Sequence, residues 1–237
     1  MQHFEFQPSY ILHARPYRET SLLLEIFTKD HGRMSAIAKG VRRPKSRGRG
    51  LLQPFVPLLI SCVGRGELLN LKDFDSGGIA SWLTGRRLVS AFYLNELLMR
   101  LLHRWDPNQD LFAHYHETLT QLEKNNDEQR ILRLFEKALL KSLGYELQLL
   151  RDVETGSAVD PEGTYAFDPE RGPILVDSLK SHTELGQSSH LFKGKSLLAL
   201  AEDKLDEISV LGDAKRLMRR ALAPHLGTKP LESRKLL

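Results

Sequence analysis

The sequence has almost no cysteine and no long apolar run. Its one cysteine, Cys62, cannot form a disulfide within the chain or supply an all-cysteine metal cluster, which fits a reducing compartment. No stretch approaches the roughly 20 apolar residues that a membrane-spanning helix needs. The start, MQHFEFQPSY, lacks the basic residues and the apolar run of a secretory signal. We therefore expect a cytoplasmic globular protein with no membrane partner and no redox chemistry.

The charge is modest in total but uneven along the chain. The net charge is +4 over 237 residues. Residues 1–80 hold 12 Lys/Arg against 7 Asp/Glu, residues 81–213 hold 15 against 22, and residues 214–237 hold 7 against 1. Two basic ends around an acidic middle are expected when separate surfaces bind partners of opposite charge.

The first 78 residues have the pattern of a small β-barrel. Segments rich in apolar and β-favouring residues alternate with turn signals such as Lys29–Gly32 and Val63–Gly66. Five short strands favour an oligonucleotide-binding (OB) barrel, which is the five-stranded member of that class. Pro54 and Pro57 predict that the fourth strand is weak or lies at an edge. The expected strands are Ser9–Ala14, Thr20–Thr28, Arg33–Gly40, Phe55–Cys62 and Glu67–Asp73.

Beyond Gly78 the apolar period changes from two to about 3.6, which predicts helices. The expected fold class is therefore α+β, with an OB domain at 1–78 and a mainly α-helical domain at 79–237. Helical periodicity fails at about 153–190, where Tyr165–Val176 predicts a small hairpin and residues 181–190 a polar, mobile segment. The expected helices are Arg87–Arg104, Asp110–Lys124, Asp127–Leu143, Gly194–Asp203 and Asp213–Leu226.

The strongest functional signal is a run of seven cations with no acid among them. Its glycines and its proline predict a loop between two barrel strands and not a helix. Cations on a mobile loop can follow a phosphate backbone and displace its counterions, so we expect DNA binding without base preference here. The alternative is a solvated charged loop without a ligand. The seven residues are Arg33, Lys39, Arg42, Arg43, Lys45, Arg47 and Arg49.

A second cluster of cations lies on the last predicted helix. Lys215, Arg216, Arg219 and Arg220 form two basic pairs one turn apart and are the second candidate for DNA contact. The alternative is a solvated helix end. Base stacking would need barrel aromatics that reach the surface, although such residues are more often core. The candidates for stacking are Tyr10, Tyr17, Phe27, Phe55 and Phe74.

Catalytic motifs are weak, and we expect no enzyme activity and no cofactor. Gly194, Lys195 and Ser196 match the end of a phosphate-binding loop. The glycine that this motif needs five positions before Gly194 is Ser189, and no buried strand leads into the segment. Nucleotide hydrolysis is therefore not expected.

Metal-binding patterns are weak as well, and we expect no metal site. His114 and His116 lie two apart on a predicted helix, so they point to different faces. Asp73 and Asp75 could be metal ligands of a nuclease, but two acids at a strand end are more commonly turn formers. A metal-dependent nuclease is the last of three candidate functions.

Short motifs along essentially the whole chain resemble the RecO family of bacterial recombination mediators. No single motif is diagnostic, but their order and spacing together are specific. The matching segments are Arg15-Pro16, Glu19-Thr20-Ser21-Leu22, Phe27-Thr28, Gly32-Arg33, Ala38-Lys39-Gly40, Leu52-Gln53-Pro54-Phe55, Gly64-Arg65-Gly66-Glu67-Leu68, Tyr93-Leu94-Asn95-Glu96-Leu97, Arg133-Leu134-Phe135-Glu136, Leu143-Gly144-Tyr145 and Lys229-Pro230-Leu231.

The resemblance implies a role in recombinational repair at the bacterial nucleoid. It implies binding to single- and double-stranded DNA, annealing of complementary strands, and contact with RecR and with the single-stranded DNA-binding protein (SSB). Together these help RecA load onto SSB-coated single strands. A simple single-strand nucleic-acid-binding module, which could prefer RNA, is the alternative. Many family members carry four zinc-binding cysteines after the Leu-Gly-Tyr motif. None follows Tyr145 here, so we expect a zinc-less hairpin held by packing alone.

The resemblance also implies a site for the C-terminal tail of SSB, which is acidic and ends in an apolar residue with a free carboxylate. The helix expected at 127–143 has an apolar stripe beside Arg130, Arg133 and Lys137. A guanidinium can hold a carboxylate with two hydrogen bonds, so Arg133 is the first candidate for that contact. Lys137, one turn on, is the candidate for the acidic residues. The alternative is that the stripe is core and the cations are solvated.

Overall fold

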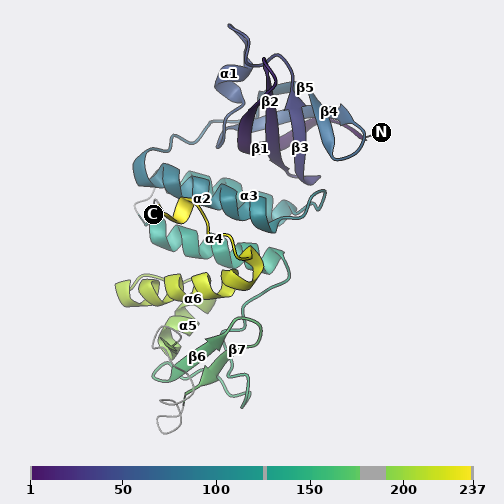
Figure 1. Cartoon of the computed structure of the whole chain (residues 1–237). Coiled ribbons are helices and arrows are strands. Elements are labelled where there is room, and N and C mark those ends of the chain that lie inside the picture. Colours follow the sequence, from purple (N-terminus) through teal and green to yellow (C-terminus); the bar gives the residue numbers. More distant parts are fainter. Residues whose placement is uncertain (1, 125–126, 177–190, 236–237) are drawn as a thin grey trace. The chain divides into compact units, whose positions relative to one another are not determined.

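A computed structural model of the chain describes residues 2–124, 127–176 and 191–235. The chain divides into two compact units, one formed by residues 1–126 with 231–237 and the other by residues 127–230. The first unit contains a β-barrel, and the second contains helices and a small sheet (Figure 1). The expected α+β class is confirmed. Residues 181–190, for which we predicted a mobile segment, lie outside the described residues.

The five strands of the first unit close into a barrel in the order β1-β2-β3-β5-β4. Neighbouring strands are antiparallel except for β3 and β5, which run parallel. This is the OB architecture that the alternating pattern predicted. The strands are β1 (Gln2–Tyr17), β2 (Ser21–Thr28), β3 (Gly32–Ala38), β4 (Pro57–Gly64) and β5 (Leu68–Ser76).

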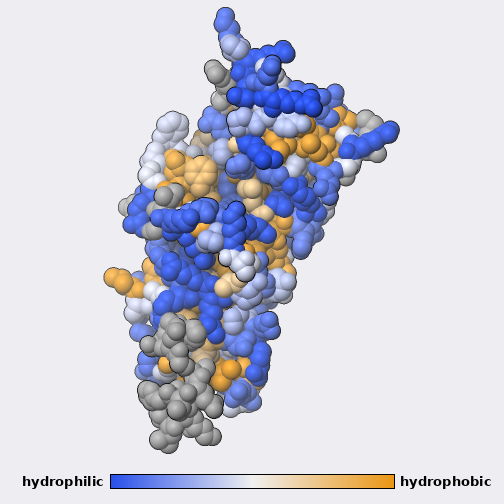
Figure 2. Space-filling model, in the orientation of Figure 1, coloured by the Kyte–Doolittle hydropathy of each residue, from blue (hydrophilic) through white to orange (hydrophobic). Residues whose placement is uncertain are grey.

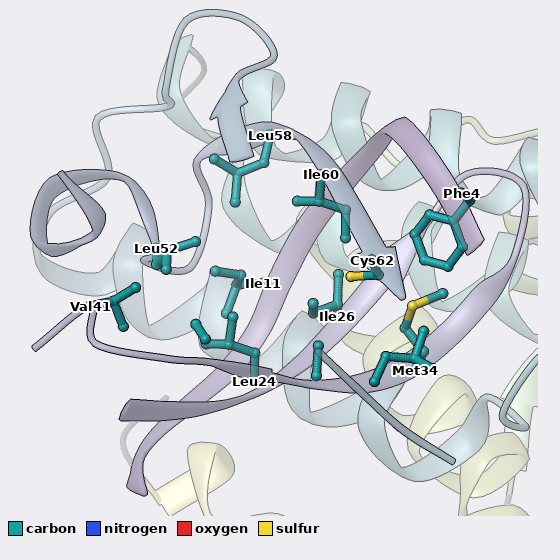
Figure 3. Packing of buried hydrophobic residues seen from close by; sticks show 13 residues of the cluster. Phe4, Ile11, Leu24, Ile26, Met34, Val41, Leu52, Leu58, Ile60 and Cys62 are labelled. Atoms are coloured by element: carbon teal, nitrogen blue, oxygen red, sulfur yellow. The ribbon is translucent and has the colours of Figure 1, made fainter. Parts of the chain in front are cut away.

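Alternate side chains of the strands point into the barrel and form its core (Figure 3). Leu24 and Ile26 of β2 and Met34 of β3 are each 0% exposed, because a period of two puts every second residue on the inner face. Cys62 also lies in this core, where burial raises the pKa of its thiol to about 12. The thiol is therefore protonated at neutral pH and is a poor metal ligand.

The prediction that prolines place the fourth strand at an edge is wrong. β4 pairs with β1 on one side and with β5 on the other. Pro57 is its first residue, and the Pro57 carbonyl still accepts a hydrogen bond from Gly77 N at 2.8 Å. Pro54 lies before the strand and forms only an isolated bridge to Ile11. A proline at the start of a strand leaves the rest of the ladder intact.

Helices α2 (Gly85–Leu101) and α3 (Gln109–Lys124) pack against the outside of the barrel in the first unit. Asn95 links the two parts, because its Nδ2 donates to Leu12 O at 2.9 Å while its Oδ1 accepts from the Tyr115 hydroxyl. The Tyr10 hydroxyl lies 2.5 Å from Nδ1 of His116. These bonds satisfy polar groups that are buried among aromatic rings.

The C-terminal segment returns to the first unit and docks on α2. The carboxylate of Glu96 accepts hydrogen bonds from Ser233 N at 2.9 Å, from Ser233 Oγ at 2.6 Å and from Glu232 N at 3.0 Å. Burial raises the pKa of the Glu96 carboxyl. These hydrogen bonds and the nearby Arg100 charge together lower the pKa by more than burial raises it, so it lies below the usual value. A short 3-10 turn, η2 (Ser233–Lys235), is thereby anchored.

The second unit pairs helices with a three-stranded sheet of order β7-β6-β8. The predicted hairpin is present, but the third strand was not predicted. The last helix begins five residues earlier than expected, at Ile208. The elements are α4 (Glu128–Ser142), β6 (Thr164–Asp168), β7 (Gly172–Leu175), β8 (Leu191–Lys193), α5 (Gly194–Ala201) and α6 (Ile208–Leu226).

A buried carboxylate, and not packing alone, ties the hairpin to the preceding turn. Asp152 is 3% exposed. Its Oδ1 accepts from Glu154 N at 3.0 Å and from the amide and hydroxyl of Thr155 at 2.7 and 2.9 Å, and its Oδ2 accepts from Leu175 N at 2.5 Å. Burial raises the Asp152 pKa, but these hydrogen bonds outweigh it and leave the pKa below the usual value. The expectation of a hairpin held by packing alone is therefore corrected.

Replacing Asp152 with asparagine should lower the free energy of unfolding by about 1–2 kcal/mol at pH 7. The side-chain NH2 of the asparagine would then face the N–H of Leu175, so two hydrogen-bond donors would meet without an acceptor. Urea denaturation measures this change. Because the Asp152 pKa is depressed in the folded state, the wild-type advantage should begin to fall near pH 4, which is about the unfolded-state pKa, and should be lost as the pH falls through the lower folded-state pKa. Asp168→Asn is the control, because Asp168 caps only the exposed turn at Glu170 and Arg171. Equal effects of the two substitutions would contradict the role given to Asp152.

Candidate nucleic-acid interface

The basic loop, defined as residues 39–47, runs from the end of β3 to a short helix, α1 (Gly48–Leu51). Backbone bonds fold it into turns: Arg42 N donates to Thr20 O at 2.9 Å and Arg43 N to Gly40 O at 3.1 Å. The prediction of a loop without helix is wrong at its last residues. α1 can form there because Gly48 lies against Val41, so close that a Cβ would stand 2.8 Å from Val41 Cβ.

Two arginines of the basic loop hold it to the barrel. Arg42 Nη1 donates to Arg18 O and Glu19 O, each at 3.2 Å, in the connection between β1 and β2. Arg47 Nη2 donates to Phe74 O and lies 3.3 Å from Asp73 Oδ1 on β5. Both guanidinium groups thus bind other parts of the same chain. We infer that Arg42 and Arg47 mainly position the loop.

Three other cations of the basic loop extend into solvent. Lys39, Arg43 and Lys45 are exposed, and they have no ion pair with any described residue. Figure 2 shows this part of the surface, near α1 in Figure 1, as hydrophilic. Exposed cations without acidic partners keep their charge available to an external phosphate. Nothing is described of the Arg49 side chain, so its predicted contact lies outside the described residues.

Partly exposed aromatic rings flank the basic loop. The guanidinium carbon of Arg47 lies 5.1 Å from the centre of the Phe74 ring, and that of Arg18 lies 5.4 Å from the centre of the Tyr17 ring. Both rings are half-buried and could stack on a base. The other three predicted candidates are core residues: Tyr10 is 3%, Phe27 is 0% and Phe55 is 6% exposed.

One exposed aromatic on the barrel was missed by the sequence reasoning. Phe6 is 60% exposed and has a φ of 49° at an irregularity in the β1–β4 pairing. In a regular strand, the position of Phe6 in the alternation would decide whether its side chain points into the barrel or out of it. The irregularity between Phe4 and Gln7 has no clear signature in the sequence, which is why the exposure of Phe6 could not be predicted.

Arg33 is not part of the basic loop. It lies at the start of β3, where its Nη1 donates to Met99 O at the end of α2. Its backbone carbonyl accepts from Trp105 N at 3.0 Å. Desolvation by burial, followed by the nearby charge of Arg104, lowers the pKa of Arg33. The structure therefore separates Arg33 from the six other cations of the predicted run.

The second predicted DNA-binding cluster is largely engaged within the second unit. Arg216 donates to Leu191 O at 3.1 Å, pairs with Asp213 at 2.6 Å and stacks on Phe192. Arg220 Nε donates to Phe167 O at 2.6 Å. Lys215 is half-buried and Arg219 is exposed. Two of the four cations thus fasten α6 to the small sheet.

The three cations predicted to hold the SSB tail are also bound within the chain. Arg130 Nη2 donates to Asp203 O at 3.1 Å. Lys137 Nζ donates to Leu200 O at 2.8 Å and Ala201 O at 2.7 Å, and it pairs with Asp203 at 2.7 Å. Both cations satisfy carbonyls at the end of α5, where the helix dipole favours positive charge. They therefore cap a helix and do not project from the surface.

Arg133 is buried in the second unit, contrary to the expectation that it stands at the lip of a pocket. Its side chain is 4% exposed and pairs with Glu136, which is 1% exposed, at 2.7 Å. A charge this deeply buried needs a partner of opposite sign, and the i, i+3 spacing on α4 supplies one. Arg133 cannot reach a tail without breaking this pair.

The segment that resembled a phosphate-binding loop cannot act as one. Gly194 N donates to Gly163 O and Lys195 N donates to Pro161 O, each at 2.9 Å, so the first amides of α5 are already used. The Lys195 side chain pairs with Glu207 at 3.1 Å. In a phosphate-binding loop these donors would instead be free to hold the phosphates.

The residues considered as metal ligands are engaged as well. Asp73 pairs with Arg47, and Asp75 accepts from Ser76 N at 2.9 Å. Nδ1 of His114 lies 2.8 Å from Asp110 O, and His116 contacts Tyr10. Within the described residues, no three His, Cys, Asp or Glu side chains gather as a metal site would require.

The closed five-stranded barrel, in which β3 and β5 run parallel, defines the class of OB-fold proteins. Within that class, the chain matches the family models described as recombination protein O N terminal, over residues 1–76, and recombination protein O C terminal, over residues 83–235. The chain therefore belongs to the RecO family.

Curated relatives support the same assignment. The chain is 47% identical over 231 residues to the DNA repair protein RecO of Nitrosococcus oceani. The aligned region covers 98% of this chain and 92% of the relative. It is 45% identical over 228 residues to that of Methylococcus capsulatus, with coverages of 96% and 90%. For Coxiella burnetii the identity is 46% over 231 residues, with coverages of 98% and 97%. None of the described helices has the length and apolar character needed to cross a bilayer.

Proposed function

We propose that the chain is a non-catalytic mediator of recombinational repair that binds single- and double-stranded DNA without base preference. The observation that carries this proposal is the set of exposed cations of the basic loop, Lys39, Arg43 and Lys45, beside the half-buried rings of Tyr17 and Phe74. Cations give affinity for any phosphate backbone, and rings stack on any base, so neither reads sequence. Family membership, with relatives named as DNA repair proteins, supports the repair role.

Strand annealing would follow from the same charges and needs no fuel. Complementary strands repel each other through their phosphates, and cations held on a rigid barrel reduce that repulsion while the bases pair. Base pairing then supplies the free energy. Arg42 and Arg47 support this role by fixing the loop to the barrel, so that less ordering is required when DNA binds.

The partners that the family suggests are RecR and the acidic C-terminal tail of SSB, with RecA loading as the outcome. Arg130, Arg133 and Lys137 are engaged within the chain, so they are poor candidates for the tail contact. Arg219, the exposed member of the cluster on α6, is now the first candidate for it. An exposed guanidinium can donate hydrogen bonds to a carboxylate without breaking a hydrogen bond within the chain.

The proposal is tested by annealing of two complementary oligonucleotides, one carrying a fluorophore and the other a quencher. An excess of protein at low salt should accelerate annealing without any nucleotide, and the acceleration should disappear as salt rises, because salt screens phosphate contacts. The same oligonucleotides made as RNA separate a DNA mediator from a general single-strand module. Annealing at the uncatalysed rate in the presence of bound protein would refute the annealing role.

A further inference from the structure

A hollow of about 310 Å³ lies on the outside of the barrel in the first unit, near the end of α2. Three guanidinium groups line it, from Arg15 on β1, Arg33 on β3 and Arg104 beyond α2. A single carboxylate, that of Glu25 on β2, is among the lining groups. Arg33 and Lys39 stand at opposite ends of β3, about 20 Å apart along the strand, so the hollow is separate from the basic loop.

The carboxylate in this hollow is already neutralised by one of the arginines. Arg104 Nη2 lies 2.9 and 3.1 Å from the two oxygens of Glu25, and Ser35 Oγ donates to the same carboxylate at 2.5 Å. Glu25 is 17% and Arg104 is 32% exposed, so this pair is partly shielded from water. The three guanidinium groups that line the hollow therefore share this one carboxylate, and Arg104 is the one that binds it directly.

The charge of Arg33 is only partly balanced within the first unit. One of its terminal nitrogens donates to Met99 O, but its Nε is buried and has no hydrogen-bond partner among the described residues. Loss of water on burial and then the neighbouring Arg104 charge disfavour the charged form of Arg33 and lower its pKa, while the Glu25 charge partly opposes this shift. The close like charges of Arg33 and Arg104 are costly, and a bound anion would offset them.

The remaining lining favours a small, doubly charged anion. Beside His13, Leu23 and Met99 provide apolar wall, and an apolar surrounding strengthens the attraction between guanidinium groups and an anion. Guanidinium groups match the oxygens of a phosphate with parallel hydrogen bonds. The carbonyl of Met99, which would repel an anion, is covered by Arg33.

We propose that this hollow binds a phosphate group through Arg15 and Arg33, either as free inorganic phosphate or as the terminal phosphate of a DNA strand. The two sources share the phosphomonoester chemistry, and they differ in whether a nucleotide chain follows the phosphate. The site does not depend on DNA binding by the basic loop, because the two sets of cations share no residue.

The first test is thermal unfolding of the full chain in increasing inorganic phosphate at constant ionic strength, with chloride as the balancing anion. Wild type should show a saturable rise of Tm, and Arg15→Gln and Arg33→Gln should each weaken the apparent phosphate affinity about tenfold, because each removes a charged hydrogen bond. Arg65→Gln, which removes an exposed cation in the turn between β4 and β5, should behave as wild type. If Arg33→Gln does not fold, the exposed Arg15 variant decides.

The second arm distinguishes the two sources of phosphate. Short single strands with a 5′-phosphate or a 5′-hydroxyl are compared by fluorescence anisotropy. If strand ends are the ligand, the phosphorylated strand should bind several-fold more tightly, and Arg15→Gln should remove the difference. If free phosphate is the ligand, both strands bind alike while phosphate still raises Tm. The proposal is overturned if wild type gains no phosphate-specific Tm shift, or if Arg15→Gln and Arg33→Gln keep the full shift.

Discussion

Replacing Arg133 with alanine is expected to lower the free energy of unfolding by about 3–5 kcal/mol, which is the usual cost of removing one partner of a buried ion pair. The side chains of Arg133 and Glu136 are 4% and 1% exposed, and they lie 2.7 Å apart. Without Arg133, the buried Glu136 carboxylate loses the guanidinium that lies 2.7 Å away. Chemical denaturation of the second unit, followed by circular dichroism, measures the change.

The matched double variant makes this prediction specific to the ion pair. Replacing Arg133 with methionine and Glu136 with leucine removes both charges and keeps most of the volume, so it should recover most of the lost stability. Lys141→Ala is the control on the same helix, because Lys141 and Glu146 form an exposed pair, 66% and 60% exposed. It should leave unfolding unchanged. A single Arg133 variant as stable as wild type would mean that the pair is open to solvent.

Neutralising the three exposed cations of the basic loop should weaken single-stranded DNA binding on the order of a hundredfold near 0.1 M salt. The variant combines Lys39→Gln, Arg43→Gln and Lys45→Gln. Because each lost phosphate contact flattens the plot of log affinity against log salt by about 0.7, three should flatten it by about 2. Fluorescence anisotropy over a salt series measures both quantities. Thermal unfolding should be unchanged, because these side chains form no ion pair with the described residues.

A charge-matched control variant separates local contact from total charge. Lys193→Gln, Lys195→Gln and Lys204→Gln remove the same number of exposed cations from the second unit. This control should keep the wild-type slope and lose little affinity. If both triple variants lose affinity equally, net charge and not the basic loop governs binding. If neither changes the slope, the DNA site lies elsewhere, with Arg219 on α6 as the next candidate.

The barrel and the main helices were predictable because their patterns are local. Alternation on β2 and β3 and the apolar stripe of α4 follow directly from the periods of strand and helix. β8 could not be predicted, since Leu191–Lys193 is too short to show a period and pairs with β6 more than twenty positions earlier. The placement of a domain boundary at residue 78 stays a prediction.

The site was predictable in composition but not in geometry. An acid-free run of cations identified the basic loop. The sequence could not show which of these cations hold the loop, because their partners are backbone carbonyls of Arg18, Glu19 and Phe74, which only the folded chain brings near. The Arg133–Glu136 pair did leave a signal, the i, i+3 spacing of opposite charges beside an apolar stripe. The hollow at Arg33 combines three strands and a helix end, so no single segment of the sequence could indicate it.

The central claim, that DNA lies on the basic loop of the barrel, is tested most directly by photo-crosslinking. Short single strands containing 5-iodouracil at successive positions would be crosslinked to the full chain, and the attachment points would be located by peptide mass spectrometry. We expect the crosslinks at Phe74 and Tyr17, the half-buried rings beside the loop, and in residues 39–47. Crosslinks confined to α6, with none on the barrel, would contradict the claim.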